Sequence, residues 1–580
     1  MGKNKLIKYL LSFSLASAVF WGNILSEVQA DTLKVEYANP KPAKKGGTLH
    51  VGYVNEGAFK GIFAPELMND GATADVAVFG SIGLFKIDNN YNFVKGGISD
   101  ISFDKDKKLA EIEISKKARW SDGQPVVARD LVYAYEIIAN KDSGSERYTD
   151  GLANIEGLEE YHTGKAETVS GLEIKDERHL VIHFKKMVPA MTVSGSGYIW
   201  EYAEPYHYLK DVAFKDLAKS DKIRKKPLFY GPYTLSKVVD GEALQWVPNR
   251  YYYGKKPQLD KISVETVATA QAATATRSGK YEILLNQNPG IYTKVKEDKS
   301  FVQLGKKQLY YTYLGFRVGK LGQDGVSVMD KDAIANDKVL RQAMAYAMNI
   351  DQVDQKFGYG LSKRANTVVP VAFGKWNNKK EKGYKFDLKK ANELLDKAGY
   401  KRQKDGYRVR PDGKKLTLTL LASKSNKNVE ASITNYIQQW KKIGVKVKLF
   451  NGRFQEFNAM IEKLTAGNAT DFDMWFAAWS TASEPTSVAS IYTASSPYNV
   501  GHFVTKENTE LIASLSSKKA FSEKYRLEQF YKWQAYMNEE AFIVPGSFTT
   551  QTVTVAKNVK GMSLGVADSY SLWDSVALTK

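Results

Sequence analysis

The pattern of hydrophobic and polar positions predicts a mixed α/β chain along its whole length. Apolar and β-branched runs, several of them with period-two alternation, predict strands over residues 46–54, 108–114, 169–174 and 179–184. Apolar residues at helical spacing predict helices over residues 128–140, 337–348, 387–398 and 428–443. Gly399 and Gly444 follow the last two helices, where glycine suits a C-cap, and a strand over 445–450 comes directly after Gly444. This order predicts α/β units in the second half of the chain.

The stretch 472–487, FDMWFAAWSTASEPTS, differs from the other strand-like runs. Its apolar run gives way after Trp479 to small hydroxyl residues and then to Glu484 and Pro485, which predicts a buried strand leaving its sheet. Ligand sites often lie at such carboxyl ends of strands. The stretch holds no cluster of histidines, cysteines or carboxylates, so it favours a protein that binds a molecule rather than one that cleaves it.

Composition narrows the classes of protein that fit this pattern. A chain of 580 residues that is 43% hydrophobic is long enough to form more than one domain. The absence of cysteine excludes disulfides, thiolate metal sites and a cysteine nucleophile. The formal charge of +19 comes from lysines scattered among acids, which favours a solvated surface over a nucleic-acid groove, so we expect no nucleic-acid partner. Attraction to an anionic cell envelope stays open as an alternative.

The N-terminus predicts export. Lys3, Lys5 and Lys8 precede an apolar run over residues 9–25, and Ala30 closes a small-residue cleavage site. Residues 1–30 therefore read as a cleavable signal peptide, with an uncleaved membrane anchor as the alternative. No other segment of the sequence is long and apolar enough to span a bilayer. We expect an extracytoplasmic protein of the periplasm or the cell surface, or one that is secreted.

The chain lacks recognisable catalytic and metal-binding motifs. No HExxH, P-loop or nucleophile elbow is present in the sequence. His179 and His183 share a predicted strand face, but no third ligand lies near them in the sequence. We therefore expect no enzyme activity, no metal site and no cofactor.

A series of motifs in fixed order carries a resemblance to a known family. Residues 119–125 (RWSDGQP) open the series, which continues through residues 157–165 (GLEEYHTGK), 230–233 (YGPY), 340–347 (LRQAMAYA), 394–400 (LLDKAGY), 440–447 (WKKIGVKV) and 472–487. The chain resembles the extracytoplasmic oligopeptide-binding proteins, the solute-binding family 5 receptors of ABC importers. The similarity runs from about residue 46 to near the C-terminus.

This resemblance implies the fold. The expected architecture is an α/β, two-lobed, periplasmic-binding-protein-like clamp of the family 5 type, with an extra subdomain in the first lobe. After the signal peptide (1–30), lobe I takes residues 31–79, an inserted subdomain at 80–210, residues 211–311 and a final return at 546–580. Lobe II takes residues 312–545. The crossings between lobes are expected near residues 310–315 and 545–547.

The resemblance also implies the function. The expected protein captures oligopeptides between two closing lobes and delivers them to the permease and ATPase subunits of an ABC transporter, acting as a monomer. An extended peptide would pair with backbone groups, which suits a receptor for many sequences. The alternatives are a peptide-pheromone receptor or a non-peptide solute receptor of the same fold, or a cell-surface adhesin or chaperone-like protein.

The expected ligand-facing residues come from four places in the chain. The main wall is placed at the end of the 472–487 stretch, and the others are at the first crossing, in a turn of the first lobe and in the inserted subdomain. Core packing is an equally open interpretation for Tyr311. The candidates are Trp479, Ser480, Thr481, Ala482 and Ser483; Tyr310, Tyr311 and Tyr313; Asn69, Asp70, Gly71 and Ala72; and Tyr148.

Two departures from the family pattern change the expectation. Relatives carry an aspartate soon after the tryptophan that pairs with the peptide's amino terminus, and some carry an arginine three residues before it. Here Ser480 to Ser483 fill the first space, and Phe476 stands at the second position. We therefore expect a receptor that holds peptides without a charged anchor for their termini. The lack of cysteine also excludes attachment through a lipidated cysteine.

Overall fold

The structure is a computed structural model that describes residues 33–424 and 427–580. The predicted signal peptide, residues 1–30, lies outside the described residues. Within the described ranges, no helix combines the length and the apolar character that crossing a membrane requires.

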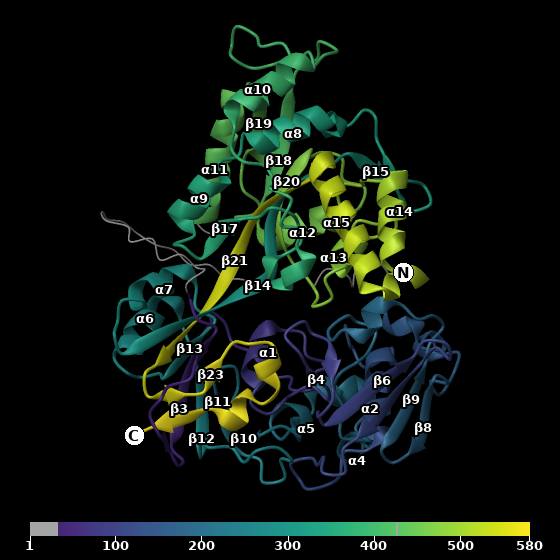
Figure 1. Cartoon of the computed structure of the whole chain (residues 1–580), viewed down its shortest axis with the longest axis vertical. Helices are drawn as coiled ribbons and strands as arrows, with labels where there is room; N and C mark the ends of the chain where they lie inside the picture. The colour runs from purple at the N-terminus through teal and green to yellow at the C-terminus, as the bar shows by residue number, and fades with distance from the viewer. Residues whose placement is uncertain (1–32, 425–426) are drawn as a thin grey trace. The chain divides into compact units, whose positions relative to one another are not determined.

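The described chain divides into two compact units. Unit 1 contains residues 307–550, and unit 2 contains residues 33–306 and 551–580. The chain passes from one unit to the other along two long strands, β14 (Phe301–Phe316) and β21 (Ile543–Ala556) (Figure 1). The crossings expected near residues 310–315 and 545–547 lie on these two strands. The division points fall a few residues outside the limits of 312 and 545 that the sequence suggested.

Unit 2 is built on a mixed sheet in the order β10-β11-β12-β3-β13-β21. Strand β3 pairs in parallel with both β12 and β13, whereas β13 and β21 are antiparallel. The strand predicted over residues 46–54 is confirmed, two residues shorter, as β3. The other elements of this part are β10 (Tyr233–Val239), β11 (Ala243–Pro248), β12 (Lys261–Val267), β3 (Thr48–Val54), β13 (Ile283–Leu285), α1 (Gly71–Ala77), α5 (Asp221–Arg224), α6 (Thr269–Arg277) and α7 (Pro289–Val295).

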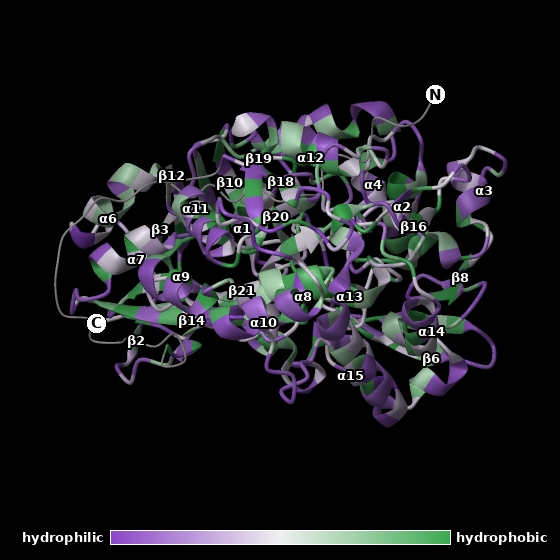
Figure 2. Cartoon of the chain, turned by 90° about the horizontal axis from the view of Figure 1, so that it is seen from above, coloured by the Kyte–Doolittle hydropathy of each residue, from purple (hydrophilic) through white to green (hydrophobic). Residues whose placement is uncertain are grey.

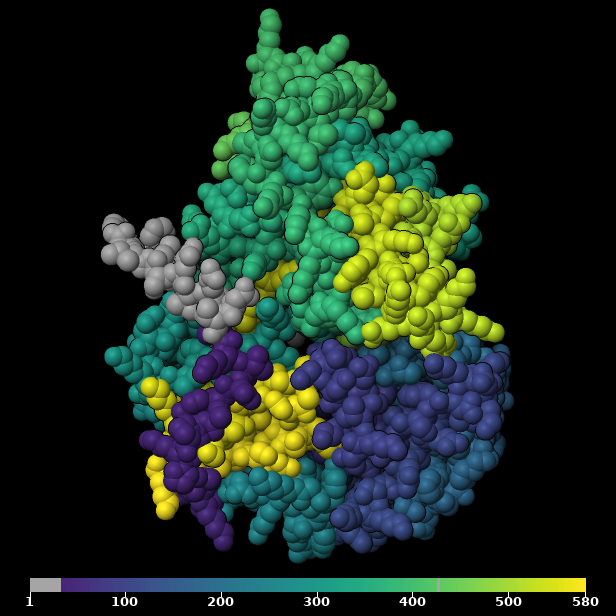
Figure 3. Space-filling model, viewed as in Figure 1, coloured from purple at the N-terminus to yellow at the C-terminus, as the bar shows by residue number. Residues whose placement is uncertain are grey.

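The last residues of the chain belong to unit 2 because they pair with its first strands. β1 (Glu36–Tyr37) pairs with β23 (Met562–Ser563), and β24 (Ala577–Thr579) lies between β2 (Ala43–Lys44) and β22 (Val559–Lys560). The purple N-terminal and yellow C-terminal segments accordingly lie side by side on the surface in Figure 3.

Residues between 80 and 210 form a separate core within unit 2. Its antiparallel sheet has the order β6-β7-β9-β8, and α2 packs its apolar face on this core. The strand predicted over residues 169–174 begins later, at Leu172, because the N–H of Gly171 turns to the carbonyl of Glu156. The elements are β6 (Ser99–Asp104), β7 (Leu109–Ile114), β9 (His179–His183), β8 (Leu172–Asp176), α2 (Ala128–Ala139), α3 (Leu158–His162), α4 (Tyr206–Leu209), β4 (Lys86–Ile87) and β5 (Phe93–Val94).

The RWSDGQP motif has a structural role in this core. Asp122 accepts a hydrogen bond from the N–H of Gln124 at 3.0 Å, and Gly123 adopts φ of +97°. A side chain at Gly123 would also collide with the ring of Tyr251, so the turn requires glycine. The buried Trp120 indole donates to Asp130 in the first turn of α2 at 2.9 Å. The motif therefore ties a tight turn to the start of a buried helix.

Unit 1 contains a sheet in the order β21-β14-β20-β18-β19, with β17 paired to β21. The helices predicted over 337–348, 387–398 and 428–443 are confirmed as α8, α10 and α11, each within two residues at either end. The elements are β14, β20 (Met474–Ser480), β18 (Thr417–Ala422), β19 (Lys446–Leu449), β17 (Ser362–Arg364), β15 (Gly319–Leu321), β16 (Ser327–Met329), α8 (Lys338–Tyr346), α9 (Ile350–Phe357), α10 (Leu388–Lys397), α11 (Lys427–Lys442), α12 (Phe457–Thr465), α13 (Ser487–Ser490), α14 (Lys506–Leu515) and α15 (Glu523–Glu540).

The core of unit 1 forms between its sheet and the apolar faces of these helices. In Figure 2 the helices α9 and α10 carry many purple, hydrophilic residues. Trp475 on β20 stands opposite Gly315 on β14, and a Cβ at Gly315 would lie 2.3 Å from the indole. Glycine at this position therefore makes the room in which the buried Trp475 packs.

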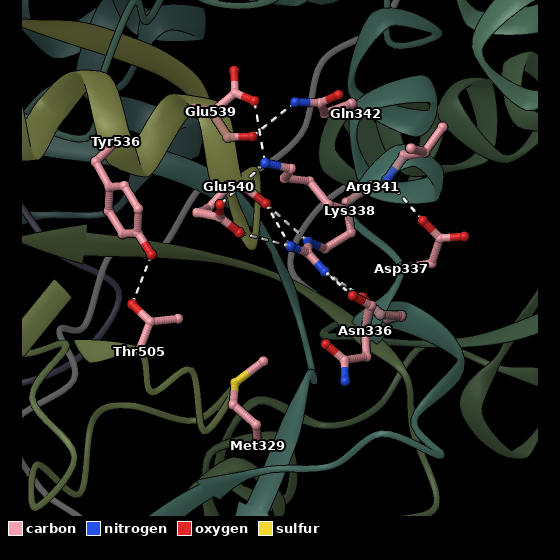
Figure 4. A network of polar contacts seen from close by, with 12 residues as sticks. Met329, Asn336, Asp337, Lys338, Arg341, Gln342, Thr505, Tyr536, Glu539 and Glu540 are labelled. Carbon is pink, nitrogen blue, oxygen red and sulfur yellow. Dashed lines mark hydrogen bonds and ion pairs between the residues drawn. The ribbon is translucent and has the colours of Figure 1, made fainter. Parts of the chain in front are cut away.

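A buried arginine connects α8 to the end of α15, as Figure 4 shows. The guanidinium of Arg341 donates to the carbonyl of Glu540 at 2.7 Å and 3.0 Å and to the carbonyls of Ala335 and Asn336. These carbonyls include the terminal one of α15, which has no partner within its own helix. Burial lowers the pKa of Arg341 to about 10. The arginine is thus a helix cap rather than a ligand contact.

Asp354 on α9 predicts a pH dependence of stability. The residue is 9% exposed; one carboxylate oxygen accepts from the Ser547 hydroxyl at 2.7 Å, and burial raises its pKa to about 7. The folded protein therefore holds a proton that the unfolded chain releases, and this contribution to stability is lost as the pH rises from about 4 through 7. Asp354→Asn should raise the free energy of unfolding at pH 8, by up to roughly 4 kcal/mol, and with it the unfolding temperature.

Thermal unfolding of the wild type and variant at pH 5 and pH 8 tests this expectation. Asp405→Asn is the control, because Asp405 is an exposed aspartate in a turn of the same unit. An unchanged pH dependence in Asp354→Asn would contradict the assignment.

Candidate functional site

Strand β20 carries the candidate site at its carboxyl end. It lies between β14 and β18, antiparallel to the first and parallel to the second. Its register with β14 runs without interruption from Phe316↔Met474 to Tyr310↔Ser480. Its register with β18 stops at Ala422↔Phe476, because β18 ends at Ala422. The last residues of β20 therefore have a paired strand on one side only.

The hydrogen bonds at the two ends of the β14 ladder identify the backbone groups that face away from β14. The N–H of Arg317 bonds to the carbonyl of Asp473, and the N–H of Thr481 bonds to the carbonyl of Leu309, both at 2.8 Å. Bonded pairs alternate along an antiparallel ladder, so odd-numbered residues of β20 point to β14. Ala478 and Ser480 point to the side that β18 has left. In the described ranges neither forms a backbone hydrogen bond there, and we call these groups the open edge.

The predicted wall residues line this end of β20. Trp479 is half-buried, and its ring meets that of Tyr498 edge-on at 5.1 Å. Thr481 continues the pairing one residue past the strand, with both its N–H and its hydroxyl directed to Leu309. Ala482 is exposed and Ser483 is half-buried. Among residues 474–487 the only ionisable side chain is Glu484.

The three tyrosines of the first crossing separate into two faces. Tyr310 is half-buried opposite Ser480, whereas Tyr311 and Tyr313 lie in the core of unit 1. The Tyr311 hydroxyl lies 3.0 Å from that of Tyr492, and burial raises the pKa of Tyr313 to about 12. Tyr311 and Tyr313 are packed in the core of unit 1, as the core-packing alternative has it for Tyr311. A ligand contact at either ring stays a prediction.

The turn predicted in the first lobe precedes α1 in unit 2. Asp70 is the N-cap of α1 and accepts from the N–H of Thr73 at 2.7 Å. Asn69 is exposed and accepts from the Lys60 ammonium at 2.9 Å. Gly71 is exposed, and Ala72 packs against the core of unit 2. The turn presents the N-terminus of a short helix, and its role toward a ligand stays a prediction.

Tyr148 packs within the inserted region of unit 2. Its ring stacks on the imidazole of His162 with 3.8 Å between centroids and 10° between planes. The residue is half-buried against the local core. These contacts account for its position by packing, and a ligand contact at Tyr148 stays a prediction.

Two features of the site escaped the sequence reasoning. The open edge depends on where β18 stops relative to β20, which is a property of strand pairing. Tyr498 reaches Trp479 from a separate loop, and no local pattern marks it.

Within the described part of the chain, no group of three or more histidine, aspartate or glutamate side chains is arranged to hold a metal ion. His179 instead lies beside Asp176, and His183 beside Glu173.

Comparisons with known proteins identify the family to which this chain is similar. Residues 98–501 match the family described as bacterial extracellular solute-binding proteins, family 5 Middle. The oligopeptide-binding protein OppA of Lactococcus lactis subsp. lactis is 41% identical over 562 residues, covering 95% of this chain and 93% of OppA. The oligopeptide-binding protein AppA of Bacillus subtilis is 25% identical and covers 92% of each chain.

Solved structures agree with these matches. Lactococcal OppA, complexed with an endogenous peptide in the closed conformation, has a TM-score of 0.77 at 41% identity, covering 92% of this chain and all of the other. The unliganded open form of the periplasmic murein tripeptide-binding protein MppA has a TM-score of 0.73 at 21% identity, over 93% of this chain and 99% of the other. The latter likeness concerns the fold alone.

The ladder geometry predicts alternating amide exchange along β20. The amides of Ala477 and Trp479 bond to β14 and should exchange slowly, whereas those of Ala478 and Ser480 should exchange faster. Hydrogen–deuterium exchange read residue by residue by electron-transfer fragmentation measures this. Uniform protection from Ala477 to Ser480 would contradict the open edge.

Proposed function

The chain belongs to the bacterial extracellular solute-binding proteins of family 5, and we propose that it is the oligopeptide receptor of an ABC importer. Its likeness to OppA over nearly the whole of both chains supports an oligopeptide as the ligand. The family places the protein outside the cytoplasm. The signal peptide at residues 1–30, the monomeric state and delivery to permease and ATPase subunits are further parts of the proposal.

The observation that carries the proposal is the open edge of β20. Two N–H groups and two carbonyls, from Ala478 and Ser480, are directed to the side where β18 has ended. An extended peptide can add to such an edge by main-chain hydrogen bonds, which give affinity without reading the side chains. Trp479 lies on the face shared with Tyr311, while Ser480 and Ala478 share the face of Tyr310 and Thr312.

The charge distribution at this edge supports peptide binding without a terminal anchor. Residues 479–483 carry no charge, and the next acid, Glu484, is buried and paired with Arg526. A buried amino terminus without a partner would be costly. We therefore propose that the receptor holds the middle of longer peptides through the backbone and apolar contacts.

The absence of a terminal anchor predicts tolerance of N-acetylation. Native mass spectrometry of the purified protein should detect bound peptides of mixed sequence. Titration calorimetry with one such peptide, free and N-acetylated, should give dissociation constants within about threefold of each other, because no fixed charge holds the terminus. A loss of affinity of a hundredfold or more on acetylation would contradict binding through the middle of the peptide.

Removing one backbone donor tests the open edge directly. Ser480→Pro deletes an N–H that has no backbone partner within the described parts of the protein, so the fold should tolerate the change better than a proline inside a ladder. Peptide affinity should fall about five- to tenfold, the worth of one hydrogen bond of roughly 1 kcal/mol. Ser480→Ala is the control, since it removes only the hydroxyl. Equal affinity in the proline and alanine variants would exclude a backbone contact at Ser480.

A further inference from the structure

A buried ion pair closes the loop that follows β20. Glu484 is 1% exposed, and one of its carboxylate oxygens accepts from the guanidinium of Arg526, a residue of α15 that is 6% exposed. The carboxylate also accepts from the N–H of Thr486 at 3.1 Å and from its hydroxyl at 2.8 Å. Arg526 in turn donates to the Thr486 hydroxyl at 2.6 Å. Three residues thus form a buried polar cluster, in which the Nε of Arg526 is the one guanidinium nitrogen that is buried without a hydrogen-bond partner among the described residues.

The cluster is anchored to the rest of unit 1 on both sides. The guanidinium of Arg526 lies 5.4 Å from the ring of Trp376, within cation–π range. The carbonyl of Glu484 accepts from Ser487 at the start of α13, at 2.6 Å from the hydroxyl and 3.2 Å from the N–H. At the other end of the loop, Thr481 is bonded to Leu309 of β14. Ala482 and Ser483 therefore form a two-residue span held at both ends.

The energetics of burial indicate a conformational role. Desolvating two charges offsets most of their attraction, so apolar packing of the same volume stabilises a fold as well as a buried ion pair does. What a hydrogen-bonded pair adds is one defined geometry for the segments that it joins. Glu484 also cannot replace the missing anchor for a ligand's amino group, because its oxygens are already bonded and it is buried.

We infer that Arg526, through Glu484 and Thr486, is a positioning residue that holds residues 481–483 in line with the open edge of β20 for ligand binding. The inference rests on the proposed function for the identity of the ligand, but not for the geometry of the loop. Among the described residues, the side-chain hydrogen bonds and the ion pair of Arg526 go to Glu484 and Thr486, and not to Ala478 or Ser480. It acts on the ligand site only through the loop.

Arg526→Met removes the charge and hydrogen bonds while keeping an apolar stem of similar length. The backbone amides of residues 481–484 and of Thr486 should then exchange at least tenfold faster in the ligand-free protein; Pro485 has no amide hydrogen. The dissociation constant of an N-acetylated, C-amidated nonapeptide of mixed sequence should rise about tenfold or more. Glu484→Gln, which keeps an acceptor oxygen but not the charge, should change both quantities in the same direction by a smaller factor.

Arg341→Met is the matched control. Arg341 is also buried in unit 1, at 1% exposed against 6% for Arg526, and bonds to the opposite end of α15, at Glu540 (Figure 4). This variant should lower the unfolding temperature comparably and leave both the loop exchange and the peptide affinity at the wild-type level. All measurements are made well below the unfolding midpoint of each variant, and Glu484→Gln serves if Arg526→Met does not fold.

Two results separate failure of the inference from failure of the proposed function. If the loop amides of Arg526→Met or Glu484→Gln exchange at the same rate as in the wild-type protein, the inference is overturned, whether or not the protein binds peptides. Faster exchange with unchanged nonapeptide affinity would also overturn it. No binding of any peptide by the wild-type protein would instead overturn the proposed function, and the exchange measurement would still decide the role of Arg526 in the loop.

Discussion

The candidate site of unit 1 depends on one constraint: of the two strands that flank β20, β18 ends earlier along it than β14 does. β18 ends opposite Phe476, whereas β14 accompanies β20 to Ser480 and, through Thr481, one residue further. A backbone that is paired on one side only must leave every second N–H and carbonyl without a ladder partner. The backbone groups of Ala478 and Ser480 are the ones that this mismatch leaves without a ladder partner among the described residues.

Buried arginines hold the segments next to this strand. Arg317 donates to the carbonyl of Phe472 at 2.8 Å, just before β20 begins, and Arg526 binds the loop after it ends. Arg341 and Arg408 perform the same task elsewhere in unit 1, on the carbonyls of Glu540 and Ile443. A planar guanidinium with five donors suits the bonding of carbonyls that helices and strands leave unpaired. These buried arginines therefore fix the positions of backbone segments in unit 1. Residues 479–483 themselves have no charged side chain.

Sequence reasoning succeeded where a pattern depends on neighbours in the chain. The helix after Asp337 is an example, because its apolar stripe and its N-cap are both local; the Asp337 side chain accepts from Val339 at 2.8 Å. The strand containing Trp479 was also predicted, since a long apolar run that ends in small polar residues is local. The tyrosines of β14 were a harder case. Tyr310, Tyr311 and Tyr313 look equivalent in sequence, and only the pairing of β14 with β20 decides which rings enter the core.

The sequence by itself determined the α/β class, the family, the absence of thiol chemistry and the uncharged character of residues 479–483. These properties follow from residue identity and from periodicity along the chain. Only the tertiary structure decided where β18 stops beside β20, that Tyr311 and Tyr313 are core residues, and that Glu484 is bonded to Arg526 on α15. Each of these depends on contacts between segments far apart in sequence, and such contacts leave no period in the chain that a local pattern can show.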